Sequence, residues 1–393
     1  MKTLVTIDEH CFKLRDKFYL SQSARILINR YLCAYDFVRL AVRVQHAQAE
    51  SELSKHHCVI DDPRIEVFEI PFFQGPVQYA KKYLSIKKNL RNVCNGCSLA
   101  IFRLPSTVGF AVWSVALKNK LPYATELVFD CSDAILTSQN FIGKMLWVKM
   151  HRSQQKACEH AIGVAPVTEF YMQQHYFSKK KQAINSHYSS IELEDKHFYH
   201  KREYPESKDA LTVIHVANHL DFKDVKGSDV LIDAMGILKK RGVIINACIV
   251  GEDRYGIKAK LEKYAQERDV LGQITFTGFL EKSKLFEKYK ECDIAILPTK
   301  AEGLPRVVIE SMAMGLPCVI SNVSGNPELV DDDMLFENGN LARIADIIES
   351  LVKNKKLYEK TSEENFNRSR QYAKEVLDGR RTEFYNKLKE LVN

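Results

Sequence analysis

Two glutamates, Glu302 and Glu310, stand eight positions apart inside the almost wholly apolar stretch AEGLPRVVIESMAMGLPCV, residues 301–319. Burying a carboxylate without partners is costly, so local structure or a ligand must satisfy both groups. One carboxylate could accept two hydrogen bonds from the vicinal hydroxyls of a ribose, and the other could bind hydroxyls of a second sugar. Alternatively, Glu302 caps the following helix and Glu310 pairs with a neighbouring Lys or Arg. Spacing alone leaves both interpretations open.

The residues around these glutamates predict a strand, a loop and a helix. Residues 293–298, DIAILP, read as a buried strand, and TKAEG is a loop at its carboxyl end. Pro305 suits the first turn of a helix, whereas Gly315 and Pro317 suit its end. The start of such a helix presents free amide groups, which bind a phosphate or another anion.

The chain from residue 211 onward alternates apolar, β-branched runs with segments of helical period. Five strands are predicted, at 211–217, 243–251, 273–280, 293–298 and 318–321. This alternation is typical of a doubly wound parallel α/β domain, in which ligands bind beyond the carboxyl ends of the strands. The loop that holds Glu302 falls at that edge.

The amino-terminal half predicts a second α/β domain of similar size. Its candidate strands are residues 2–7, 37–45, 65–71, 99–105, 123–129 and 161–167, and the polar segment 191–210 reads as a linker. We therefore expect a domain over 1–200, a second domain over 201–375, and a last helical segment, 376–393, that packs back on the first domain.

Composition and charge describe an intracellular globular protein. The chain has 393 residues, of which 45% are hydrophobic and 27% charged. Its longest apolar stretch, 106–117, is too short to cross a bilayer, and the amino terminus lacks the pattern of a signal peptide, so a cytoplasmic location is predicted. Residues 1–205 carry 28 Lys+Arg against 19 Asp+Glu, a net +9, which leaves 29 against 31, or −2, for the rest. The basic half suits an anionic partner, but nucleic acid is not expected because aromatic platforms are not interleaved with the cations.

Metal chemistry has weak support in the sequence. Ten cysteines are scattered along the chain and read as reduced thiols. Cys94 and Cys97 have the spacing of half a zinc or redox site, but no second pair follows at ligand spacing. Asp331 and Asp333 lie in a turn and read as solvated. We expect no metal and no cofactor.

The glutamate stretch resembles the signature of the retaining nucleotide-sugar glycosyltransferases of family 4. The resemblance rests on Glu302, Gly303, Leu304, Pro305, Glu310, Gly315 and Pro317, followed by SGNPELV at 324–330 and MLFENGN at 334–340. It implies the GT-B architecture, two Rossmann-like domains facing across a cleft.

The resemblance also implies roles for individual residues. Glu302 would contact the transferred sugar, and Lys226 would offset the charge of the donor diphosphate, so these two are the catalytic candidates. The donor-binding candidates are Glu310, which would hold the ribose, and Gly303, Leu304, Pro305, Arg306, Asn218, His219, Gly251, Glu252, Gly278 and Phe279.

The sequence departs from the family pattern at three places. Asn218 or His219 stands where an Arg is customary, and His219 or Lys223 could replace that cation. No glycine-rich loop follows the first strand, where the chain reads TIDEHCFKLRD. Many family members carry a His after a central strand, near the reacting sugar carbon. The corresponding region here, LPYATELVFDCSD, has no His and offers Glu126 and Asp130 instead.

The implied reaction moves a sugar from a nucleoside diphosphate sugar, UDP- or GDP-linked, to a glycan or lipid-linked acceptor, with retention of configuration. Cell-surface polysaccharide biosynthesis is the implied setting. A non-catalytic glycosyltransferase-like subunit and a nucleotide-sugar 2-epimerase of the same fold are the alternatives.

Residues 78–93, QYAKKYLSIKKNLRNV, form a basic amphipathic segment. Tyr79, Tyr83, Ile86 and Leu90 would share one helical face, with lysines around it. The helix either docks this face on its own sheet or lies on an anionic membrane, and the two interpretations are compatible if the lysines face lipid. The second predicts peripheral contact with the inner face of the cell membrane.

Overall fold

The computed structural model describes residues 1–54, 57–138 and 140–392, and these residues fold into two compact units. The amino-terminal unit comprises Met1–Cys131, Met145–Tyr188 and Asp378–Asn393, and the carboxyl-terminal unit comprises Ser132–Lys144 and Ser189–Leu377. Asn393, the end of the predicted last segment, lies outside the described residues. Neither unit is one continuous stretch of chain, because the segment Ser132–Lys144 clusters with the second unit.

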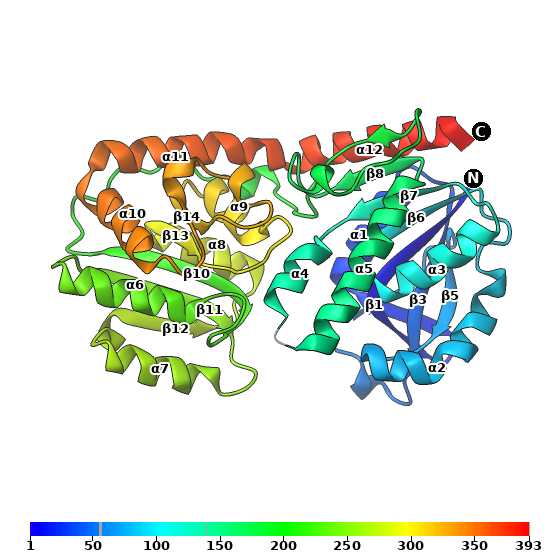
Figure 1. Cartoon of the computed structure of the whole chain (residues 1–393), viewed down its shortest axis with the longest axis horizontal. Coiled ribbons are helices and arrows are strands. Elements are labelled where there is room, and N and C mark those ends of the chain that lie inside the picture. The colour runs from blue at the N-terminus through cyan, green and yellow to red at the C-terminus, as the bar shows by residue number, and fades with distance from the viewer. Residues whose placement is uncertain (55–56, 139, 393) are drawn as a thin grey trace. The chain divides into compact units, whose positions relative to one another are not determined.

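The amino-terminal unit is built on a nine-stranded sheet among its described residues. Its strands are β1 (Lys2–Leu14), β2 (Lys17–Ser21), β3 (Phe37–His46), β4 (His57–Val59), β5 (Ile65–Pro71), β6 (Leu99–Leu104), β7 (Tyr123–Leu127), β8 (Gly163–Pro166) and β9 (Ile184–Asn185). Its helices are α1 (Gln22–Leu32), α2 (Gly75–Asn89), α3 (Thr107–Lys118) and most of α5 (Phe141–Glu159). The parallel strands run in the order β5-β3-β1-β6-β7-β8-β9, a doubly wound arrangement (Figure 1).

Strand β1 is longer than the predicted strand at 2–7. It continues through charged residues to Leu14, pairs in parallel with β3, and then turns back into the antiparallel strand β2. The charges are accommodated because neighbouring strands supply partners: Arg43 lies 2.5 Å from Asp8, and Lys13 lies 2.6 Å from Glu69. An extended hairpin therefore stands where the family pattern has a glycine-rich loop.

The carboxyl-terminal unit has a parallel sheet in the order β12-β11-β10-β13-β14-β15. Its strands are β10 (Leu211–His219), β11 (Ile245–Glu252), β12 (Ile274–Gly278), β13 (Ile294–Leu297), β14 (Cys318–Ser321) and β15 (Leu335–Phe336). The first five correspond to the five predicted strands, whereas the two-residue edge strand β15 was not predicted. Strand order reverses between β10 and β13, which makes the edge beyond these two strands the expected ligand position.

Helices flank this sheet (Figure 1). They are α6 (Ser228–Lys240), α7 (Ile257–Glu267), α8 (Lys282–Glu291), α9 (Arg306–Ala313), α10 (Leu341–Lys353) and α11 (Lys355–Ser369), with α4 (Cys131–Thr137) contributed from the earlier segment. The last helix, α12 (Lys374–Val392), belongs to the amino-terminal unit from Asp378 onward. Among the helices of the described residues, none combines the length and apolar character needed to cross a membrane.

A buried carboxylate fixes α12 to the amino-terminal unit. Glu126 of β7 accepts hydrogen bonds from the hydroxyls of Tyr31 (2.7 Å), Tyr188 (2.9 Å) and Tyr385 of α12 (2.5 Å). Burial alone would raise the pKa of Glu126, but the Arg103 charge and the tyrosine hydroxyls lower it overall. Glu126 is thus an ionised structural group.

Asp130, the other carboxylate of the same region, is also engaged inside this unit. It is fully buried, accepts a hydrogen bond from the Tyr176 hydroxyl (2.5 Å), and lies 3.0 Å from His175 Nδ1. Both carboxylates therefore have structural partners within their own unit.

Replacing Tyr385 with Phe is expected to destabilise the amino-terminal unit by about 1.5–3 kcal/mol, because a hydrogen bond to a buried charge is lost. Both tryptophans, Trp113 and Trp147, belong to this unit, so urea unfolding followed by tryptophan fluorescence measures the change. Because the pKa of Glu126 is lowered in the fold, its contribution is present at neutral pH and disappears as pH falls through that lowered value. The difference in unfolding free energy between wild type and Tyr385→Phe should therefore become smaller in acid.

The matched control is Tyr255→Phe, since Tyr255 is 78% exposed. Equal losses of stability in the two variants would contradict the role of Glu126 in holding α12.

Candidate functional site

The two loops that meet at the switch point of the carboxyl-terminal sheet are pressed together. Gly227, in the loop after β10, has a φ of +77°, and a Cβ there would overlap the carbonyl oxygen of Pro298, in the loop after β13. The amide of Lys300 donates to the carbonyl of Val225 (2.8 Å), and the Thr299 hydroxyl donates to the same carbonyl (3.1 Å). Only glycine permits this approach, which fixes Lys226 beside the loop that holds Glu302.

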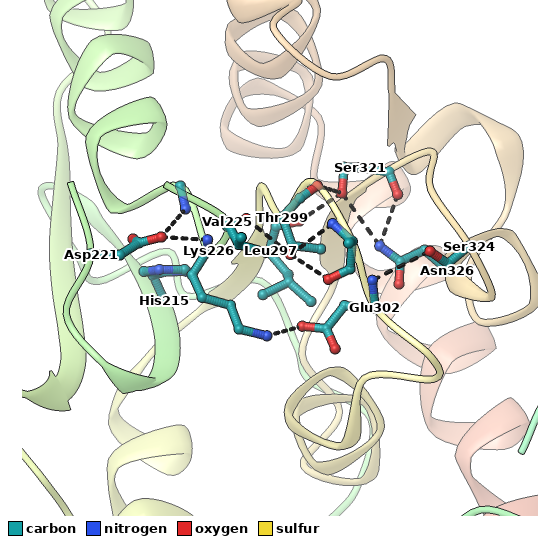
Figure 2. A network of polar contacts seen from close by, with 12 residues as sticks. His215, Asp221, Val225, Lys226, Leu297, Thr299, Glu302, Ser321, Ser324 and Asn326 are labelled. Atoms are coloured by element: carbon teal, nitrogen blue, oxygen red, sulfur yellow. Dashed lines mark hydrogen bonds and ion pairs between the residues drawn. The ribbon is translucent and has the colours of Figure 1, made fainter. Parts of the chain in front are cut away.

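The start of α6 is already occupied by a carboxylate from its own loop. Asp221 accepts from the amides of Lys226, Gly227 (3.3 Å) and Ser228 (3.2 Å) and from the Ser228 hydroxyl (3.1 Å), as Figure 2 shows in part. Below it, the fully buried His215 lies 3.3 Å from that hydroxyl, and burial lowers its pKa, which keeps the ring neutral. These amides are therefore satisfied without a ligand.

The structure brings the two catalytic candidates together. Lys226 Nζ forms an ion pair with Glu302 Oε1 across the two loops (Figure 2). The side chains keep 28% and 17% of their surface exposed, so both remain accessible to a ligand. When the ion pair separates, the ammonium can bind an anion and the carboxylate can accept hydrogen bonds from a set of hydroxyls. Each side chain then exchanges its partner in the pair for a group of the ligand.

The start of α9 is open, in contrast to that of α6. Its N-cap residue is Pro305, and no side chain of the described residues caps it. Glu302 is therefore not the helix cap considered from the sequence. The amides of the first turn, beginning at Arg306, remain available for an anion beside the Lys226–Glu302 pair.

The loop before α9 is held from below by a polar network. Ser321, at the end of β14, donates to the carbonyl of Thr299 (2.6 Å), and Asn326 donates to the carbonyl of Ser321 (2.9 Å) (Figure 2). Gly303, Leu304 and Pro305 are buried in this loop. Their backbone is thus fixed before any ligand arrives.

Glu310 lies in the second turn of α9 with cations around it. Burial raises its pKa, while the charges of Lys282 and Arg306 and a hydrogen bond from the Tyr289 hydroxyl (3.4 Å) act in the opposite direction. Lys282, at the start of α8, donates to the carbonyl of Glu192 (2.6 Å), and burial lowers its pKa. Glu310 is thus a partly desolvated acceptor whose hydrogen bonds are incompletely met, as a ribose site requires.

The other predicted donor residues occupy the ends of β10, β11 and β12. Asn218 and His219 are exposed where β10 ends, and Gly251 is packed closely against the backbone of that end. Glu252 pairs with Arg254 (2.7 Å). Gly278 has a φ of +72° at the end of β12, and the following Phe279 is 66% exposed.

Lys223, considered as a replacement for the missing Arg, has its ammonium over the rings of Phe222 (5.5 Å) and Tyr264 (5.9 Å). It is therefore engaged by aromatic partners, one of them on α7, whereas Lys226 engages Glu302.

Sequence reasoning missed three contributors. Asp221 lies six residues before the N-cap Gly227, too far for the usual capping pattern. Lys282 stands in a charged helix with no motif. The Ser324 hydroxyl accepts a hydrogen bond from the amide of Glu302 (3.3 Å) and donates one to the carboxylate of Asp133 (2.5 Å). Asp133 lies in the segment Ser132–Lys144, which is remote in the sequence.

The described residues contain no group of three or more His, Cys, Asp or Glu side chains arranged to hold a metal ion.

Comparison with known proteins gives one family match and several similar folds. Residues 198–368 match the family described as glycosyl transferases group 1. The chain is 24% identical to Protein CapJ of Staphylococcus aureus over 367 residues, which are 93% of this chain and 90% of CapJ. It is 32% identical to the amylovoran biosynthesis glycosyltransferase AmsK of Erwinia amylovora over 133 residues, which are 31% of this chain and 32% of AmsK.

Solved structures share the fold over nearly the whole chain. Sucrose-phosphate synthase from Thermosynechococcus elongatus gives a TM-score of 0.69 at 15% identity and 99% coverage of both chains. HepE from Anabaena, in complex with UDP and glucose, gives 0.66 at 16% identity, covering 98% of this chain and 99% of its own. The predicted fold class, two Rossmann-like α/β domains of the GT-B kind, is confirmed.

Replacing Gly227 with Ala should disrupt the contact between the two loops. Gly242→Ala is the matched control, since Gly242 has nearly the same φ, +76°, but no neighbour that a Cβ would meet. The control should lose about 1–2 kcal/mol through backbone strain, and Gly227→Ala a further ~1–3 kcal/mol through overlap with Pro298. Urea unfolding followed by circular dichroism measures both, and equal losses would contradict the close approach.

Proposed function

We propose that this chain is a glycosyltransferase that moves a hexose from a nucleoside diphosphate sugar to a hydroxyl of a glycan or lipid-linked acceptor, with retention of anomeric configuration. The observation that carries the proposal is the Lys226–Glu302 ion pair beside the open start of α9, at the switch point of a parallel sheet. The site contains a cation and free amides for a diphosphate and a carboxylate for sugar hydroxyls.

The charges of the pair are redistributed when the donor binds. The diphosphate takes Lys226 and the first amides of α9, and Glu302 turns to accept hydrogen bonds from the sugar. As the bond between the anomeric carbon and the diphosphate oxygen breaks, negative charge grows on the leaving diphosphate, where Lys226 and the helix amides oppose it. The acceptor oxygen forms the new bond to that carbon from the same face, and its proton passes to the leaving diphosphate oxygen.

Glu310 holds the ribose in this proposal. Its carboxylate accepts hydrogen bonds from the vicinal hydroxyls, and Lys282 adds a cation next to it that balances its charge. The complexes of HepE with UDP and glucose and with UDP-glucose support a nucleotide-sugar donor for this fold, and UDP is the nucleotide to test first.

The relatives support the proposed setting of the reaction. The names of CapJ and AmsK, and the match of 198–368 to group 1, support a role in cell-surface polysaccharide biosynthesis. No cofactor or metal is included in the proposed reaction. The 2-epimerase and non-catalytic alternatives differ in product: an epimerase releases an altered nucleotide sugar without acceptor, and a non-catalytic subunit releases no nucleoside diphosphate.

Substituting Lys226 with Gln or Glu302 with Gln should slow acceptor-dependent release of nucleoside diphosphate by about 100- to 1,000-fold, because stabilisation of the leaving charge or of the reacting sugar is lost. A panel of nucleotide sugars screened by thermal shift identifies the donor, and a coupled assay measures release. Lys223→Gln is the matched control, as its ammonium faces aromatic rings. Wild-type rates in both site variants would exclude this assignment.

Substituting Glu310 with Gln should act on binding and on stability in opposite directions. Donor affinity should fall about 10- to 100-fold, since hydrogen bonds to a charged acceptor are lost. The raised pKa means that the folded state binds a proton more readily than the unfolded state, so the ionised group opposes folding at neutral pH. The melting temperature of the free variant should therefore rise.

The same raised pKa predicts that wild-type donor affinity weakens on acidification at a higher pH than an ordinary glutamate would allow. Titration calorimetry across pH measures it. A variant that is both less stable and fully competent to bind donor would show that Glu310 is structural.

A further inference from the structure

The peptide group between Ala301 and Glu302 is held at both ends by hydroxyls. Its N–H donates to the Ser324 hydroxyl (3.3 Å), as Figure 2 shows, and its carbonyl oxygen lies 3.0 Å from the Thr299 hydroxyl. Because a peptide group is planar, two contacts on its opposite sides fix its orientation. The Cα of Glu302 follows directly, so these contacts also set the direction in which the Glu302 side chain leaves the loop.

Ser324 has a backbone conformation that is unfavourable for any residue with a Cβ. Its φ is +53°, in the left-handed region that only glycine adopts without strain. Five non-glycine residues of the described chain have such a φ, namely Arg15, Lys120, Lys223, Asp269 and Ser324. Ser324 alone among these five is buried, with 7% of its surface exposed. Strain of this kind persists where surrounding contacts hold the residue, and the Ser324 hydroxyl makes such contacts.

A buried carboxylate orients the Ser324 hydroxyl. The hydroxyl donates to Asp133 Oδ2 at 2.5 Å, and Asp133 keeps only 6% of its surface exposed. Since the single hydroxyl proton is directed at Asp133, the oxygen is left to accept from the amide of Glu302. A hydrogen bond to a carboxylate is also stronger than one between neutral groups. The Asp133 carboxylate, the Ser324 hydroxyl and the Glu302 amide thus form one hydrogen-bond chain.

Asp133 joins this chain from a distant part of the sequence. It lies in the first turn of α4, 191 residues before Ser324. Its segment, Ser132–Lys144, clusters with the carboxyl-terminal unit, although the chain on either side of that segment belongs to the amino-terminal unit. The loop of Glu302 therefore depends on a group that the continuous part of its own unit, Ser189–Leu377, does not supply.

We propose that Asp133 is a positioning residue for sugar transfer: through the Ser324 hydroxyl it holds the peptide group of Glu302 so that the Glu302 carboxylate meets the transferred sugar. This role rests on the proposed function, in which Glu302 contacts the sugar while Lys226 and Glu310 hold the nucleotide part of the donor. Breaking the hydrogen-bond chain therefore acts on the transfer step and leaves nucleotide binding intact. A displacement of about 1 Å at a reacting group can slow a reaction by about 100-fold.

Ser324→Gly and Ser324→Ala both remove the hydroxyl, but only glycine adopts a φ of +53° without strain. Acceptor-dependent release of nucleoside diphosphate should fall about 10- to 100-fold in both variants. Titration calorimetry should find the affinity for the free nucleoside diphosphate, UDP in the first instance, within about twofold of wild type. Ser324→Gly should nevertheless melt at a higher temperature than Ser324→Ala. Rates that follow the melting temperatures, or UDP binding that weakens as much as the rate, would show that the hydroxyl only supports the fold.

The matched control is Ser350→Ala. Ser350 is an exposed serine of the same unit, and its hydroxyl donates to the carbonyl of Asp346 (2.8 Å). Its removal should leave the rate of release at the wild-type value.

Combined substitutions test whether the three groups act as one chain. Asp133→Ala should slow release as much as Ser324→Ala, and the two together should cost less than about twofold more, because each breaks the same chain. Asp133→Asn should keep more activity than Asp133→Ala, since its amide oxygen still accepts from the Ser324 hydroxyl. In a Glu302→Gln background, Ser324→Ala should have far less effect than in wild type. Additive losses in either combination would overturn the proposal.

Hydrogen exchange at the Glu302 amide tests the chain without any chemistry. Followed by NMR of the full chain with isotope-labelled glutamate, exchange should be at least about tenfold faster in Ser324→Ala and Asp133→Ala than in wild type. Unchanged exchange would overturn the positioning of this peptide group. A wild type that turns over no nucleotide sugar would defeat the proposed function, and the role of Asp133 with it. Wild-type rates in the variants of an active enzyme would overturn the positioning role alone.

Discussion

The close approach of two backbone loops is the constraint on which the carboxyl-terminal site depends. Gly227 lies against the carbonyl of Pro298, and the amide and hydroxyl that follow Pro298 bond to Val225. Lys226 lies between Val225 and Gly227, the residues that make these two contacts. Its backbone is therefore fixed, and its side chain lies beside the loop of Glu302. The ion pair is thus a consequence of backbone geometry. This pre-organisation removes part of the entropy that a flexible lysine would lose in the proposed binding of a diphosphate.

The polar and charged groups of the site differ in how far the protein itself satisfies their hydrogen bonds and charges. Two helices begin at the switch point, and Asp221 satisfies the amides of α6, whereas those of α9 stay open. Glu302 and Lys226 satisfy each other without a donor. Glu310 is the exception, because burial raises its pKa and its ionised form opposes folding. A chain that retains such a group trades stability for a function, and the function proposed for it is the binding of paired hydroxyls.

The amino-terminal unit is assembled from separate stretches of chain, which must be held together. Glu126 gathers hydroxyls from α1, from Tyr188 and from α12, so three distant segments share one buried charge. Asp130 is likewise used inside this unit, where it accepts a hydrogen bond from the Tyr176 hydroxyl (2.5 Å).

The sequence by itself determined the regular elements and the chemical candidates, because apolar periodicity and turn residues are local properties. It located β10 to β14, the loop of Glu302 and the helix of Glu310. It missed the length of β1, whose charges depend on partners in β3 and β5, and it missed β15, which is too short to have a period. Only the tertiary structure paired Lys226 with Glu302, assigned Asp221 to α6, and brought Asp133 to Ser324. Each of these contacts joins loops or segments through the strand order of the sheet, and that order is a non-local property which no short window of sequence contains.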